Sequence, residues 1–262
     1  MRPISNLALS LSKGGVPRIS GIGRTCYSDA MNDTLWYVAA AAILLIVTHN
    51  GLAWPPVRRV LVARFDEWPF RILYSMVAVA AFTLLILAYL EAPEIYLWEP
   101  PTALRHVSLT LMPLAWILLV CGYTGPNPTA VGLDLFSRLE GKGILKVTRH
   151  PVLWAVMLWA VAHLLANGDA AGTILFGAIL VMTGLGIANI ERKKRIEHGF
   201  DWQRFVEQTS NVPFVALIQG RAKLTVAEIG WWRIGVALAI HVAVLYFHGA
   251  IFGVAPLPGF SF

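Results

Sequence analysis

The sequence predicts an all-α fold, a polytopic transmembrane helical bundle of about six spans. Of the 262 residues, 57% are apolar and only 14% are charged, whereas soluble domains carry about 25% charged residues. Six long apolar stretches contain no acidic residue, and a helix needs roughly 17 to 25 mainly apolar residues to cross the hydrocarbon core. These stretches are residues 35–54, 70–90, 106–123, 152–166, 170–190 and 231–252.

The first three spans and the sixth qualify by length and hydropathy alone. The fourth, residues 152–166, is the shortest, but Pro151 suits the first position of a helix and marks its start. The connection 167–169 is so short that the fourth and fifth spans form an antiparallel hairpin. The long connection 191–230 opens as a basic helical extension. Its apolar patch, 212–218, is too short to span and is expected to lie at the interface or to re-enter partway.

The basic residues alternate strongly between connections. Three lysines and arginines lie in the first connection, four in the third and seven in the fifth. The second connection has Arg105 alone, and the fourth and the C-terminal tail have none. The positive-inside rule therefore places the odd-numbered connections in the cytoplasm and both termini outside. The net charge of +6 is explained by topology, and no nucleic-acid-binding motif surrounds it. We expect membrane lipid, and no nucleic acid, as a partner.

The N-terminal segment conflicts with this topology, because residues 1–30 carry four basic residues that the rule would place outside. The segment is rich in serine and glycine and has no long apolar region, so it is a poor secretory signal. Met31 stands just before the first span. We expect residues 1–30 to be a flexible or mis-annotated segment and residues 31–262 to form a single transmembrane domain.

Histidines inside the spans are the first candidates for chemistry, because an ionisable residue in hydrocarbon is costly. His49, His163 and His241 fall in the first, fourth and sixth spans, and His248 lies two turns beyond His241 on the same helix face. A single buried imidazole can satisfy its N–H by bonding a neighbouring helix. Two imidazoles from different helices can instead ligate a haem iron. The residues alone leave both interpretations open.

A second constellation stands at the start of the fourth span, where Arg149 and His150 precede Pro151. The free backbone N–H groups of a helix N-terminus, backed by two basic side chains, predict a site for an anion such as a haem propionate, a phosphate or a carboxylate. The alternative is a membrane anchor with a helix cap. Farther along this span, Asn167 lies one turn after His163 and is expected to orient its imidazole.

Four segments together resemble the NnrU family of bacterial membrane proteins. They are residues 147–154 (VTRHPVLW), 159–169 (WAVAHLLANGD), 48–53 (THNGLA) and 201–214, from Asp-Trp to Ser-Asn-Val-Pro-Phe. The resemblance is long and gap-free around the fourth span and runs from about residue 32 to 224. It implies a location in the bacterial inner (cytoplasmic) membrane.

The resemblance also implies haem chemistry. The family is associated with denitrification and nitric oxide metabolism, and it is related to the plant 15-cis-ζ-carotene isomerase, an integral membrane enzyme with haem b. By this resemblance His49 and His163 are the haem ligands, and the substrate is an apolar polyene or a nitrogen-oxide-related compound. His241 lies outside the resembling region and is the rival ligand. From the span boundaries we expect His49 and His163 to lie about 9 Å apart in depth and to face each other across one haem.

The sequence departs from the isomerase pattern in two places. Residues 88–91 lack the redox-linked histidine of the plant enzyme, and Ala160 replaces a cysteine that stands three residues before the second ligand. The resemblance therefore implies haem binding, but it does not carry the ligand switching of that enzyme over to this sequence.

A more distant similarity runs to membrane methyltransferases of the isoprenylcysteine and phospholipid type. These share Arg-His-Pro at a helix start and an acidic pair before a terminal helix. Here Arg149 and His150 match, but Glu191 supplies only half of the acidic pair because Ile190 occupies the other position. The alternative function is a methyltransferase that binds S-adenosylmethionine through Arg149, His150 and Glu191.

Overall fold

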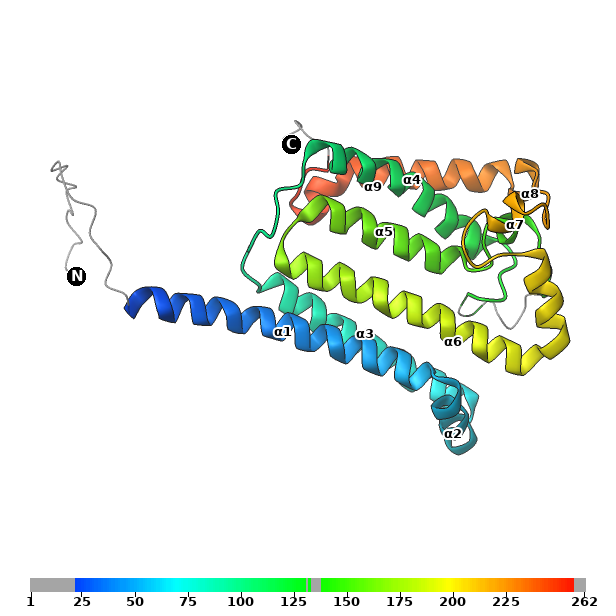
Figure 1. Cartoon of the computed structure of the whole chain (residues 1–262), viewed down its shortest axis with the longest axis horizontal. Helices are drawn as coiled ribbons and strands as arrows, with labels where there is room; N and C mark the ends of the chain where they lie inside the picture. The colour runs from blue at the N-terminus through cyan, green and yellow to red at the C-terminus, as the bar shows by residue number, and fades with distance from the viewer. Residues whose placement is uncertain (1–21, 131, 133–137, 257–262) are drawn as a thin grey trace, which may run out of the picture.

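The computed structural model describes residues 22–130, 132 and 138–256, and most of them are helical (Figure 1). The elements are α1 (Ile22–Ala53), α2 (Pro55–Phe65), α3 (Glu67–Leu90), α4 (Thr102–Thr124), η1 (Gly143–Lys146), α5 (Pro151–Asn167), α6 (Ala170–Gln208), α7 (Val215–Ile218), α8 (Val226–Ile229) and α9 (Trp231–Phe252). Five of them, α1 from Thr34 onward, α3, α4, α6 and α9, are long and apolar enough to cross a membrane, and α5 is a shorter apolar helix. These six helices coincide with the predicted spans, which confirms the all-α membrane bundle.

The spanning helices lie side by side in the order α3, α1, α6, α5, α4, α9. Consecutive spans run in opposite directions, so the bundle has two ends (Figure 1). We call the end that carries α2, η1, α7 and α8 the basic end, because it holds the three connections rich in lysine and arginine. The opposite end, the hairpin end, carries the connection 91–101, the turn 167–169 and the last residues of α9.

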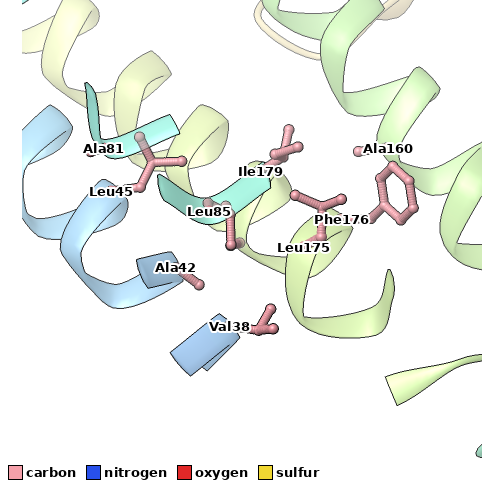
Figure 2. Packing of buried hydrophobic residues seen from close by; sticks show 10 residues of the cluster. Val38, Ala42, Leu45, Ala81, Leu85, Ala160, Leu175, Phe176 and Ile179 are labelled. Carbon is pink, nitrogen blue, oxygen red and sulfur yellow. The ribbon is translucent and has the colours of Figure 1, made fainter. Parts of the chain in front are cut away.

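The best-packed part of the core joins α1, α3 and α6 and reaches α5. Val38, Ala42 and Leu45 are buried on one face of α1, because their spacing of four and three residues places them on one stripe. Figure 2 shows this stripe meeting Leu85 of α3 and side chains of α6, with Phe176 beside Ala160 of α5. Many outward-facing side chains of the same helices are also apolar, which suits a bundle surrounded by lipid rather than water.

The long connection after the fifth span opens as the predicted helical extension. Helix α6 continues beyond the apolar span to Gln208 and turns at Gly199, whose φ of 49° is not helical. The apolar patch then forms α7 at the basic end, where Phe214 and Ile218 are 53% and 82% exposed and Ala216 is fully buried. Such an exposed apolar turn beside basic residues suits the membrane interface.

The N-terminal segment is described only in part. Residues 1–21 lie outside the described residues, and residues 22–30 form the first turns of α1. In Figure 1, α1 extends past the hairpin end of the bundle. All other helices follow residue 31 and pack as one unit.

Candidate functional site

A cavity of about 830 Å³ lies at the hairpin end between α4, α5 and α9. Its lining includes the apolar Leu109, Met112, Ala162, Val244 and Leu245, the polar His163, Asn167, His241 and His248, and the charged Glu94, Glu99, Arg105 and Asp169. Arg105 and Trp116 both line it from α4, and eleven residues of helix separate them by about 16 Å. A long cavity with apolar walls and a few polar groups is typical of a site for a ligand with an apolar body.

The turn between α5 and α6 fixes the rim of this cavity. Gly168 has a φ of 72° and reverses the chain in the left-handed region. Its carbonyl oxygen accepts the backbone N–H groups of Leu97 at 2.8 Å and Trp98 at 3.2 Å. Asp169 then caps α6, because its Oδ1 accepts the N–H of Gly172 at 2.6 Å. The turn therefore ties the connection before α4 to the α5–α6 hairpin.

His163 lines the cavity from α5 with one ring nitrogen engaged. Its Nδ1 lies 2.8 Å from the backbone carbonyl oxygen of Trp159, one turn earlier. Because a carbonyl only accepts, Nδ1 carries the proton and Nε2 of the neutral ring keeps its lone pair. The rings of Trp159 and Phe176 pack on the imidazole at centroid distances of 4.7 and 5.1 Å. Asn167 lines the same cavity, but the Trp159 carbonyl, and not Asn167 as expected, accepts the hydrogen bond from Nδ1–H.

Helix α9 contributes two more histidines to the cavity. His248 donates its Nδ1–H to the backbone carbonyl of Val254 at 2.8 Å, and its ring packs on Phe252 with a centroid distance of 4.8 Å. The same tautomer argument leaves its Nε2 lone pair free. His241 lines the cavity seven residues earlier, about 10 Å deeper along the helix, and bonds no other residue within the described part of the chain.

Trp116 also lines the cavity from α4. Its Nε1 is buried and has no hydrogen-bond partner among the described residues. A buried donor without a partner costs free energy. Neither its spacing nor its neighbours distinguished this tryptophan in the sequence.

His49 lies at the other end of the bundle. It stands four residues before the end of α1 and lies 3.0 to 3.1 Å from the hydroxyl oxygen of Tyr74, which comes from α3. Its neighbour Asn50 accepts a bond from Asn189 of α6 at 3.1 Å, whereas His163 packs on Phe176 of the same helix. Thirteen residues of α6 separate these two points, which is about 20 Å.

The structure therefore does not place His49 and His163 across one haem. The expected offset of about 9 Å assumed that the first and fourth spans begin at flat membrane surfaces. Helix α1 instead continues as one helix from Ile22. Its Asn50 lies beside Asn189 of α6, toward the basic end of the bundle. The hydropathy of a span gives its length but not its register against its neighbours.

The structure does bring Arg149, His150 and Glu191 together at the basic end. The Nε2 of His150 and the Nε of Arg149 each lie 2.8 Å from Oε1 of Glu191. His150 is fully buried, and burial lowers its pKa below the ordinary 6.5, although the Glu191 carboxylate opposes this shift. The neutral ring donates its Nε2–H to the carboxylate, while Nδ1 is buried without a partner among the described residues.

This cluster also fastens the start of α5 to the chain after α6. The backbone N–H of Arg149 donates to Ser210, and its guanidinium lies 3.3 Å from the hydroxyl of Thr209. Thr148 donates its hydroxyl hydrogen to the carbonyl of Asn211 at 2.6 Å. The anion that Arg149 and His150 organise is thus a carboxylate of the protein itself. Glu191 pairs with both Arg149 and His150 within the folded chain, so the geometry of the three groups of the methyltransferase alternative supports a structural role.

The fold and the cavity define a class, a polytopic helical membrane protein with a histidine-lined cavity. The chain belongs to the NnrU family, whose model, described as NnrU protein, matches residues 37–256. This match extends beyond the expected limit at residue 224 and includes all of α9. His241 and His248 therefore lie within the family region, and the expectation that His241 falls outside it is wrong.

Two plant proteins named 15-cis-zeta-carotene isomerase, chloroplastic, are similar to part of the chain. The Arabidopsis thaliana protein is 29% identical over 82 residues and the Zea mays protein is 30% identical over 82 residues. Each match covers 31% of this chain and 22% of the relative, so it spans about a fifth of the relatives' length. No solved structure matches the chain.

Proposed function

We propose that this chain is an integral membrane protein that binds haem b in the cavity at the hairpin end and acts as an isomerase on an apolar polyene. The observation that carries the proposal is His163, whose Nε2 lone pair is left free on a long, largely apolar cavity of about 830 Å³. Haem iron is commonly held by such an imidazole nitrogen. The described residues contain no cluster of three histidine, cysteine or acidic side chains for another metal ion.

The protein side chains have separate tasks in this proposal. The carbonyl of Trp159 holds the His163 ring in the tautomer that can ligate iron, as supporting groups do in other metal sites. The apolar wall excludes water and accepts an apolar substrate. A bound haem would supply a redox-active Lewis-acid centre.

The apolar lining of the cavity favours a polyene over a nitrogen oxide as the substrate. Apolar side chains make favourable contacts with a hydrocarbon, whereas a small polar molecule gains little from them. The name of the two plant relatives, a carotene isomerase, agrees with this choice. The second hypothesis is a role in denitrification, in which a small nitrogen oxide would bind at the same haem.

Haem binding is tested with detergent-purified protein by its visible absorption and by haem content per chain. We expect a Soret band and close to one haem per chain, and loss of most of the haem in His163→Ala. His106→Ala is the matched control, because His106 also bonds a carbonyl through Nδ1 but does not line the cavity. A wild-type protein expressed with ample haem that contains none would overturn the proposal.

Isomerase action is tested by incubating the haem-loaded protein with 15-cis-ζ-carotene in detergent and separating the isomers by chromatography. We expect conversion by the wild type and little conversion by His163→Ala. If haem is bound but the isomer ratio stays at the value of the protein-free control, the polyene is the wrong substrate. Nitric oxide added to the reduced protein then tests the denitrification hypothesis, because its binding to the haem would shift the Soret band.

A further inference from the structure

Two of the cavity histidines share a geometry that the others lack. His163 and His248 each stand four residues before the last residue of their helices, α5 and α9, and both helices end at the hairpin end. Both line the cavity, and both donate a hydrogen bond from Nδ1–H to a backbone carbonyl at 2.8 Å. Their Nε2 lone pairs are therefore available near the same end of the bundle, on the same cavity and from two different helices.

The other two intramembrane histidines do not meet these conditions. His241 lies about 10 Å deeper on α9, and no bond to a described residue fixes its tautomer. His49 is bonded to Tyr74 near the basic end, about 20 Å from His163 along the bundle. The pair that the family resemblance implies, His49 with His163, thus does not fit one haem in this structure.

We propose that His248 of α9, together with His163 of α5, would hold the haem through its Nε2. The inference rests on the proposed function for the presence of haem, but it assigns a different ligand from the one that the resemblance implies. Two imidazoles are sufficient for a six-coordinate haem, so the lack of a third metal-binding side chain in the described residues is not an obstacle.

The assignment has a structural consequence for α9. This helix packs mainly on α4, and its outer face is exposed along its length, with Val242 at 62% and Ile251 at 61%. A ligand held by both His163 and His248 would join α9 to α5 directly. We therefore expect haem binding to protect α9 from proteolysis and to raise the melting temperature of the protein in detergent.

The experiment compares the spin state of the haem in His248→Ala, His241→Ala, His49→Ala and the control His106→Ala. We expect a low-spin spectrum in the wild type and in the last three variants. His248→Ala should retain part of its haem in a high-spin form, and added imidazole should restore the low-spin spectrum. His248→Met should stay six-coordinate with a higher reduction potential, because methionine ligation raises the potential of haem.

The outcomes separate this inference from the proposed function. A wild-type protein that contains no haem would contradict both the proposed function and the assignment of His248. A low-spin spectrum that survives in His248→Ala but is lost in His49→Ala or His241→Ala keeps the haem and overturns the assignment of His248. If His248→Ala proves poorly folded, the reduction potential of His248→Met tests the assignment instead. An unchanged reduction potential would mean that residue 248 does not bind the iron.

Discussion

Gly168 is the residue whose replacement the structure resists most clearly. Its φ of 72° is unfavourable for residues with a Cβ, and a Cβ added there would lie 2.2 Å from the carbonyl oxygen of Trp98. We expect Gly168→Ala to lower the free energy of unfolding by at least about 1 to 2 kcal/mol. It should also weaken ligand retention, because Trp98 belongs to the connection that borders the cavity.

The matched control is Gly177→Ala, since Gly177 is helical and a Cβ there meets nothing within 4 Å. Thermal unfolding in detergent, followed by circular dichroism, compares the two variants. Equal melting temperatures would show that the rim relaxes around the added methyl group.

Buried His150 makes the stability of the folded protein depend on pH. Burial lowers its pKa, so the unfolded chain binds the proton more readily than the folded protein does. The stabilising contribution is therefore complete above the unfolded pKa of about 6.5 and is lost as the pH falls below it. One proton accounts for a slope of at most about 1.4 kcal/mol per pH unit.

Melting temperatures between pH 7.5 and 5 test this dependence. We expect a decrease toward acid that is shallower in His150→Gln, which cannot titrate, and unchanged in His198→Gln, because His198 is exposed. A decrease of the same slope in His150→Gln would assign the dependence to other groups.

At the scale of the elements, hydropathy and length predicted the six spans well, because lipid imposes both on any crossing helix. They did not predict the register between neighbouring helices, that is, which residues of one helix lie beside which residues of the next. The register of α1 against α6 depends on contacts such as the bond from Asn189 to the carbonyl of Asn50, which leave no periodic trace in the sequence. The pairing of Arg149 and His150 with Glu191 was accessible through a motif, whereas the free lone pair of His248 depends on a carbonyl six residues later.

The ion pair between Arg149 and Glu191 joins the start of α5 to α6, and the two side chains are only 10% and 19% exposed. Removing one partner of such a pair leaves the other charge buried, which costs about 3 to 5 kcal/mol. We expect Arg149→Met to lower the free energy of unfolding by about 3 kcal/mol, against a few tenths for the exposed Arg138→Met.

A double-mutant cycle completes this test. Arg149→Met combined with Glu191→Gln should destabilise the protein by clearly less than the sum of the two single changes, because no charge is then left alone. Additive effects would mean that the two groups do not interact in the folded protein. An Arg149→Met variant as stable as Arg138→Met would leave only an anchoring role for this arginine.

For the whole molecule, the six helices place the beginning of α1 and the end of α9 on the same side, at the hairpin end (Figure 1). The connections that carry 14 lysines and arginines all lie at the basic end, whereas between the spans that meet at the hairpin end the sequence has Arg105 alone, in the first turn of α4. Short basic loops resist translocation, so we predict that the basic end faces the cytoplasm and the histidine cavity opens on the outer side.

Fusions of a reporter to truncated or full-length chains test this topology. A reporter that is active only in the cytoplasm should be active when fused after Glu140 or Arg221, within the third and fifth connections, and inactive after Gly168 or Phe252. A second reporter that is active only after export should give the opposite pattern and controls for unstable fusions. Activity of the cytoplasmic reporter after Phe252 would show that the charge bias does not orient this bundle, and it would place the cavity on the cytoplasmic side.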